Sequence, residues 1–265
     1  MPFLAGSLMT FVLNVAPAAG TPDSQPVAPE AVGFLYKTVL FEGENYAYSV
    51  YVPPNYTPDK AWPIILFLHG SGERGNDGLL QTEVGIGTAI RKNWHEVPAI
   101  VVMPQCRPGQ MWIGSMARMA LKCVEMASSE YHCDPDRFYL TGLSLGGNGT
   151  WLLGAQLADR LAAIVPICGF AELEQSTGLA DRLAPHLAKL PIWCAHGGQD
   201  KAVPVAKAHE MVAAINKAGG NVIYKEREGM GHNVWDTTYA DPNLWRWLFA
   251  QKRGVPPARP APEKP

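Results

Sequence analysis

The sequence lacks several features that would assign a chain to a specialised class of protein. It has no strong excess of either charge, with a formal net charge of -2 over 265 residues, so we expect no nucleic-acid partner and no pull toward anionic membranes. Its five cysteines form no close pair and no metal-ligand spacing, which excludes a disulfide framework. A single disulfide between Cys123 and Cys133 is still possible if the protein is exported.

Apolar runs of bilayer length are also missing. The stretch from Phe3 to Val15 covers about 13 residues, whereas a membrane span takes about 20. The small-x-small triplet Ala16-Pro17-Ala18 follows it, so we expect residues 1–19 to be a signal peptide that is cut near Ala18. The mature chain would then have no integral membrane segment and would be secreted or periplasmic. The stretch lacks the usual Lys or Arg near its start, and a cytoplasmic location is the alternative.

Composition divides the rest of the chain into one domain and two flanking segments. A length of 265 residues suits a single large core. Pro, Thr, Asp and Ser gather over residues 20–31, which we expect to be a flexible linker. A folded domain is expected over residues 32–252, and a Pro-rich disordered tail over 253–265.

The folded part begins with a hairpin and continues as alternating strands and helices. Tyr36–Glu42 and Tyr46–Val52 flank a turn-forming Gly43-Glu44-Asn45, which is typical of antiparallel strands. Six apolar strand candidates follow, separated by segments with helical spacing. They are Ile64–His69, Ala99–Met103, Arg137–Gly142, Ala162–Cys168, Pro191–His196 and Asn221–Glu226. Such runs predict an α/β fold with a mostly parallel sheet, an N-terminal antiparallel hairpin and helices on both faces.

Three of the intervening helices carry start signals. Ser115 is placed to cap one helix, Pro204 opens a second, and Asp241-Pro242 begins the last. Another helix-like segment, Asn148 to Ala158, directly follows a Gly-x-Ser-x-Gly motif.

That motif carries the strongest chemical signal. Gly142-Leu143-Ser144-Leu145-Gly146 lies between a strand and a helix, which is the context of a nucleophile elbow. The glycines leave space for a strained turn that pushes Ser144 out at a helix N-terminus, where developing negative charge is favoured. We therefore expect Ser144 to be a catalytic nucleophile.

A serine nucleophile needs a base and an acid to orient that base. Asp200 follows one strand and His232, in a glycine-flanked loop, follows the next, so the chain order serine, acid, histidine is the one found in this fold. Asp236 is the rival acid because it lies near the histidine in sequence. His69 and His196 close apolar strands before glycine and are expected to be structural.

The tetrahedral intermediate also requires hydrogen-bond donors. The elbow supplies the backbone N–H of Leu145, and the small residues after the first parallel strand suggest the backbone N–H of Ser71 as the second. In the same loop, Glu73 and Arg74 are expected to form a bracing ion pair, with substrate contact as the alternative.

Together these segments resemble secreted or envelope α/β-hydrolases related to the phospholipase/carboxylesterase family, some of which are labelled predicted peptidases. The matching segments are Phe67–Gly75, Pro104–Cys106 through Trp112, Asp136–Trp151, His196–Asp200 and Gly231-His232. The resemblance implies an ester-cleaving triad and places Gln105 and Trp112 near the acyl pocket.

The sequence thus predicts a serine carboxylic-ester hydrolase that works through an acyl-enzyme without metal or organic cofactor. Only Phe170 to Leu190 leaves room for a lid, so we expect an open cleft in which Trp112 and Trp235 stack on the substrate, with burial in the core as the alternative for both. The expected substrate is a small-molecule or carbohydrate ester with a short or aromatic acyl group. A serine peptidase using the same triad and a non-catalytic binding module are the alternatives.

Overall fold

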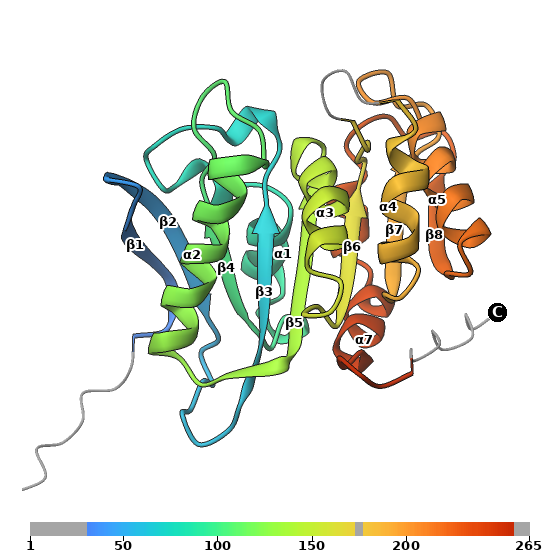
Figure 1. Ribbon diagram of the computed structural model, residues 1–265. Coiled ribbons are helices and arrows are strands. Elements are labelled where there is room, and N and C mark those ends of the chain that lie inside the picture. The colour runs from blue at the N-terminus through green and yellow to red at the C-terminus, as the bar shows by residue number, and fades with distance from the viewer. Residues whose placement is uncertain (1–30, 173–176, 257–265) are drawn as a thin grey trace, which may run out of the picture. The chain divides into compact units, whose positions relative to one another are not determined.

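An eight-stranded sheet organises the chain in the computed structural model, which describes residues 31–172 and 177–256 (Figure 1). The strand order is β1-β2-β4-β3-β5-β6-β7-β8. The strands are β1 (Gly33–Phe41), β2 (Glu44–Val52), β3 (Trp62–Leu68), β4 (Ile100–Pro104), β5 (Cys133–Leu143), β6 (Ala163–Ile167), β7 (Ile192–Gly197) and β8 (Val222–Arg227). The pairs β1–β2 and β2–β4 are antiparallel, and all other pairs are parallel. The predicted hairpin and mostly parallel sheet are confirmed.

Burial explains why the parallel strands read as continuous apolar runs. Every residue of β3, β4, β6 and β7 is buried, because helices cover both faces of the sheet. Only the start of β5 differs clearly from expectation: it begins at Cys133 rather than at Arg137. The turn-like sequence Asp134-Pro135-Asp136 obscured this part of the strand, whose register with β3 shifts at the same place.

The helices divide into two groups, one on each face. They are α1 (Ile86–Lys92), α2 (Gly114–Glu130), α3 (Leu145–Gln156), α4 (Leu179–Leu187), α5 (Ala206–Lys217), α6 (Trp235–Tyr239) and α7 (Pro242–Ala250). The apolar residues of α2, α3, α4 and α5 share one core cluster, and those of α1, α6 and α7 share the other (Figure 1). Within the described residues, every helix is too short or too polar to cross a membrane.

All three expected helix starts can be compared directly with the structure. Helix α5 begins at Ala206, two residues after Pro204. Asp241 caps α7, where its side chain accepts a hydrogen bond from the N–H of Asn243 at 2.9 Å, as predicted. The expected cap at Ser115 is wrong. Helix α2 begins one residue earlier with Ile113 at the cap position, and the Ser115 hydroxyl donates instead to Glu42 at 2.6 Å.

The segment that left room for a lid contributes to the core instead. Helix α4 packs between α3 and α5 and buries Leu179, Ala184 and Leu187. Helix α4 therefore covers the sheet face, while Glu172, nearer the start of the same segment, donates its N–H to Asn148 in the first turn of α3. The expected signal peptide and most of the expected linker lie outside the described residues.

All five cysteines are free thiols. The disulfide between Cys123 and Cys133 that the sequence allowed is not formed. The Cys123 sulfur instead contacts the sulfur of Met119 at 3.6 Å. Burial raises the pKa of the Cys133 thiol to about 11, so the thiol is protonated at neutral pH.

Candidate active site

Ser144 lies at the sharp turn between β5 and α3. Its backbone has φ 54° and ψ -115°, a conformation that a residue with a side chain rarely adopts and that persists only where the surrounding structure imposes it. The strand before and the twelve-residue helix after it supply that constraint. The serine therefore stands at the N-terminus of α3, where the helix dipole favours negative charge.

The two glycines of the motif make the turn possible by close backbone contact. A Cβ on Gly142 would lie 2.4 Å from the carbonyl oxygen of Gly146, and a Cβ on Gly146 would lie 1.8 Å from that of Leu68. Neither position can hold a larger residue without moving main chain. The sequence suggested that glycine is needed to leave space for this turn. The structure shows that the space is taken up by main chain of the turn and of β3.

The structure brings Ser144, His232 and Asp200 into one hydrogen-bonded chain. Nε2 of His232 lies 2.9 Å from Oγ of Ser144, and Nδ1 of His232 lies 2.6 Å from Oδ2 of Asp200. The three residues come from loops after β5, β7 and β8, whose carboxyl ends share one edge of the sheet. A proton on Nδ1 donated to Asp200 leaves Nε2 free to accept the serine proton.

The surroundings of Asp200 keep its carboxyl group ionised. Its side chain is fully buried, and Oδ1 accepts hydrogen bonds from the N–H groups of Ala202 and Val203, both at 2.9 Å. Burial alone would raise the pKa of Asp200, but the hydrogen bonds from His232 and from these amides outweigh it and hold the pKa below the usual value. Asp236, the rival acid, is exposed and accepts a hydrogen bond from Asn233 instead.

A buried histidine fixes the loop after β3. The ring nitrogen Nε2 of His69 accepts the N–H of Cys106 at 2.9 Å, so the ring proton is on Nδ1, which donates to the carbonyl oxygen of Gly70 at 2.6 Å. Burial lowers the pKa of His69 to about 4, which keeps the ring neutral. Because the two ends of a trans peptide unit point in opposite directions, the inward carbonyl of Gly70 turns the N–H of Ser71 outward.

This loop lies directly beside the serine. A Cβ on Gly70 would be 3.6 Å from Cβ of Ser144, so the peptide that carries the N–H of Ser71 borders the nucleophile. Leu145 is the first residue of α3, and the N–H groups of a first helical turn have no partner within the helix. These two amides are the candidate oxyanion donors.

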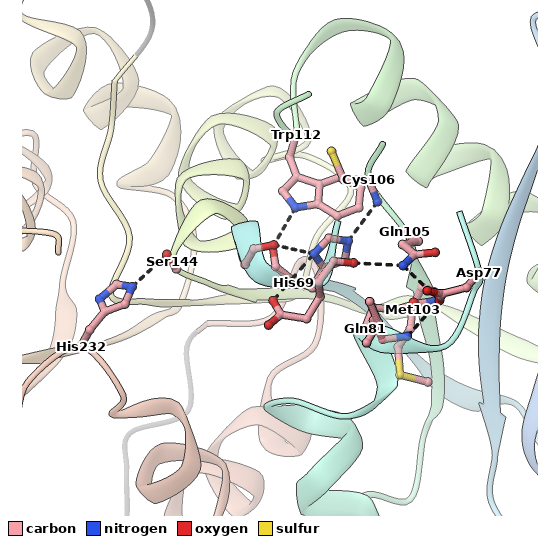
Figure 2. A network of polar contacts seen from close by, with 12 residues as sticks. His69, Asp77, Gln81, Met103, Gln105, Cys106, Trp112, Ser144 and His232 are labelled. Atoms are coloured by element: carbon pink, nitrogen blue, oxygen red, sulfur yellow. Dashed lines mark hydrogen bonds and ion pairs between the residues drawn. The ribbon is translucent and has the colours of Figure 1, made fainter. Parts of the chain in front are cut away.

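Gln105 and Trp112 are bound to the loop after β3, and Figure 2 shows both in the network of polar contacts around His69. Both are 1% exposed. The Gln105 side chain accepts the N–H of Gly78 at 2.7 Å and donates to the carbonyl of Glu73 at 3.0 Å, while the Trp112 ring donates to the carbonyl of His69 at 2.9 Å. Direct contact of either residue with the acyl group does not fit this burial, and the structure assigns them to support of the loop.

Trp235 has a different setting. It begins α6, is partly exposed and meets the ring of His232 edge to face, with 5.3 Å between ring centroids. Of the three residues expected to contact the substrate, Trp235 is the one whose position suits that role. A sequence cannot separate such a tryptophan from a buried one, because both follow apolar or helical patterns.

The expected ion pair between Glu73 and Arg74 is not formed. Oε2 of Glu73 and Nε of Arg74 are buried and have no hydrogen-bond partner among the described residues. Oε2 of Glu73 lies 4.0 Å from Nδ1 of His69, and burial raises the pKa of this carboxyl group. The guanidinium of Arg74 lies beside the Cys106 thiol.

Cys168 is a neighbour of the site that its apolar sequence context concealed. It follows β6 with φ 48°, and its thiol lies 3.0 Å from the carbonyl oxygen of His232. With Asp200 and His232 it forms a group whose ligand atoms lie within 4.8 Å of one another, a set that a metal ion can use. The 2.6 Å contact between His232 and Asp200 is explained by a hydrogen bond from Nδ1 to the carboxylate. Burial raises the pKa of Cys168 to about 12, so the thiol is protonated at neutral pH and is a poor metal ligand in that form.

Sheet order, helix placement and the serine turn define an α/β-hydrolase fold. The sequence profile of the phospholipase/carboxylesterase family matches residues 93–241, and the chain belongs to that family. The matched range includes Ser144, Asp200 and His232, whereas the loop after β3 precedes it.

Relatives and solved structures agree with this fold. The crystal structure of a thermostable esterase is 30% identical, with a TM-score of 0.74 over 83% of this chain and 63% of that one. A feruloyl esterase module from Clostridium thermocellum, solved with sinapinate, is 21% identical with a TM-score of 0.64, covering 84% of this chain and 91% of the module. The latter likeness shows the fold alone.

Curated relatives are more distant and much longer. A secreted protein of Arthroderma benhamiae is 22% identical over 74% of this chain and 24% of its own length. A bifunctional acetylxylan esterase/xylanase of Neocallimastix patriciarum is 25% identical over 48% of this chain and 18% of its own length. The chain thus spans a quarter or less of these two relatives.

Proposed function

We propose that the protein is a serine carboxylic-ester hydrolase that works through an acyl-enzyme. The observation that carries the proposal is the unbroken hydrogen-bonded chain from Ser144 through His232 to Asp200. Its distances fall in the range that lets a base take the proton of a nucleophile. The order of the three residues along the chain and their placement after β5, β7 and β8 add further support.

The geometry supports a two-step reaction. Oγ of Ser144 attacks the ester carbonyl carbon while His232 takes its proton, and the new oxyanion faces the N–H groups of Leu145 and Ser71. Collapse of this intermediate expels the alcohol, which leaves with the proton from His232. Water then repeats the same steps on the acyl group and releases the acid. Asp200 stays ionised and stabilises the imidazolium that forms in each step.

The substrate class follows from what borders the serine. Trp235 offers a partly exposed ring next to His232, which suits an aromatic acyl group or a sugar. Helix α4, which forms most of the described part of the segment before β7, packs onto the sheet face, so this helix adds no apolar cover for a long acyl chain. We therefore propose short-chain, aromatic or carbohydrate-linked esters. A feruloyl esterase and an acetylxylan esterase are among the similar proteins, which supports this range.

A comparison of kcat/KM values tests the proposal. The substrates are p-nitrophenyl acetate and butyrate, methyl ferulate, p-nitrophenyl palmitate and a set of peptide anilides, all measured under one condition. We expect the short and aromatic esters to be cleaved at least tenfold better than the palmitate ester, because only limited apolar area is available to bind a long chain at about 25 cal/mol per Å². A tenfold preference for palmitate indicates a lipase, a preference for anilides indicates a peptidase, and cleavage of none of them indicates a non-catalytic module.

Export of the enzyme is a separate proposal. It depends on the apolar stretch and small-residue triplet at residues 1–18, which lie outside the described residues. Together with the expected linker, this segment would leave a catalytic domain that starts near residue 32.

A further inference from the structure

A second histidine contacts the acid of the proposed triad. His196 is the penultimate residue of β7 and its side chain is fully buried. Its Nε2 atom lies 2.9 Å from the carbonyl oxygen of Val203 and 3.2 Å from Oδ2 of Asp200. The same Oδ2 atom receives Nδ1 of His232 at 2.6 Å. Two imidazole rings therefore meet one carboxylate oxygen.

The partners of His196 determine where its proton is. A carbonyl and a carboxylate only accept hydrogen bonds, so Nε2 must carry the hydrogen. The other nitrogen, Nδ1, is buried and has no hydrogen-bond partner in the part of the chain that the structure describes. A second proton there would be a buried unpaired donor on a charged ring, which is strongly unfavourable. The ring is therefore held neutral, in agreement with the pKa of His196, which burial lowers.

We propose that His196 is a positioning residue whose Nε2–H, hydrogen-bonded to the carbonyl of Val203, also lies beside Oδ2 of Asp200 and so keeps the carboxylate ionised and aligned for His232. The role rests on the proposed serine hydrolase mechanism, since it acts through the acid of that triad. It differs from a purely structural role, in which the ring would only tie β7 to the carbonyl of Val203.

The groups that face Asp200 define the expected effect on pH dependence. They are His232 from the loop after β8, His196 from β7, the thiol of Cys168 after β6 and the amides of Ala202 and Val203. His196 is in turn influenced by His209 on α5, whose Nε2 lies 2.6 Å from Oε2 of Glu226.

Loss of this N–H has an effect of defined sign. A carboxylate that loses the positive end of a nearby N–H dipole binds protons more tightly, so the coupled pair of Asp200 and His232 should take up a proton at higher pH in the variant. Because the neutral histidine is the base, the acidic limb of the kcat/KM profile should move to higher pH. We expect a shift of about one pH unit, which corresponds to about a tenfold loss of activity on that limb.

Two replacements of His196 separate the roles. His196→Gln keeps an N–H near the position of Nε2, whereas His196→Leu has similar bulk and no donor. With p-nitrophenyl butyrate as substrate, His196→Leu should show the shifted limb, and His196→Gln should follow the wild-type limb. His132→Gln is the control, because His132 bonds the carbonyl of Pro58 beside the start of β5, away from the serine end of that strand. An unchanged limb in His196→Leu, with activity lowered equally at every pH, would overturn the proposal.

A measurement on the wild-type protein covers the case in which His196→Leu does not fold. Long-range ¹H–¹⁵N spectra distinguish the two neutral tautomers of histidine from its charged form. We expect the His196 ring to keep its proton on Nε2 from pH 5 to pH 8. A proton on Nδ1, or titration within that range, would contradict the proposal.

The failure of the mechanism itself has a different signature. If wild-type Ser144 does not react with a fluorophosphonate and no ester is cleaved, the proposed function is wrong, and with it the role of His196 in catalysis. If Ser144 is labelled and the acidic limb of His196→Leu does not move, only the role of His196 is wrong.

Discussion

The hydroxyl of Ser144 is the atom on which the proposed chemistry depends. Ser144→Ala removes it and retains the same Cβ at the same strained turn, so the fold should persist. We expect kcat/KM to fall by about a thousandfold or more, with the oxyanion donors left in place. The circular dichroism spectrum checks the fold, and fluorophosphonate labelling checks the site.

Ser115→Ala is the matched control, because the Ser115 hydroxyl bonds only Glu42 among the described contacts. The control should be labelled like the wild type, and Ser144→Ala should not be labelled. Persistent labelling of Ser144→Ala would assign the nucleophile to another residue.

Among single residues, the sequence predicts those whose role follows from a motif or from their order along the chain. Ser144 has its glycines, and Asp200 and His232 follow successive strands, so their meeting could be expected before the structure. The roles of Gln105 and Trp112 could not, because burial beneath the loop depends on contacts with residues some thirty to forty positions away. His196 was expected to be structural, and only its 3.2 Å distance to Asp200 connects it to the proposed chemistry.

The packing of α3 against β3 makes the serine turn intolerant of added atoms. In Gly146→Ala the new methyl group would lie 1.8 Å from the carbonyl oxygen of Leu68, so the helix or the strand must move. Overpacking of this kind typically costs about 1–3 kcal/mol, and more where backbone is the obstacle. We expect the free energy of unfolding, measured in urea, to fall by about 3 kcal/mol.

Gly154→Ala, in the same helix, is the matched control. Its methyl group would meet the flexible end of Ile164 at 3.2 Å, and alanine favours a helix over glycine by about 1 kcal/mol. Its stability should be unchanged or slightly higher. An equal loss of stability in both variants would show that contact with β3 is not what makes Gly146→Ala destabilising.

Elements with strong periodicity were predictable and short ones were not. The strands β3, β4, β6 and β7 follow from apolar runs because they are buried on both faces, and the hairpin follows from its turn residues. The helices α1, α4 and α6 have nine or fewer residues, which is too short for a clear helical period; α7 is as short, but Asp241-Pro242 marks its start. Their places are determined by the sheet they cover, and this information is not local in the sequence.

The whole fold should lose stability in mild acid because it holds His69 neutral. Burial lowers the pKa of His69 from 6.5 to about 4. Between these values the unfolded chain binds a proton that the folded chain does not, so the free energy of unfolding decreases as pH falls through this window. The contribution of one such group is at most about 1.4 kcal/mol per pH unit.

Urea unfolding at pH 7 and pH 5 measures this effect in the wild type and in His69→Asn. Asparagine can still donate to the carbonyl of Gly70 but does not titrate, so the stability difference between the two pH values should be smaller in the variant. Equal differences in both proteins would show that other groups, such as His196 with its lowered pKa, account for the acid sensitivity.

The order of the triad along the chain also sets when activity can begin during synthesis. Ser144 precedes the proposed base, His232, by 88 residues, and Asp200 lies between them in the loop after β7. At about 5–20 residues per second, a ribosome needs roughly 4 to 18 seconds to go from the serine to the histidine. During that interval the nascent chain has a nucleophile without a base. The enzyme is therefore made in a latent form, and it becomes able to attack esters in the cell that makes it only after the last strand of the sheet has been translated.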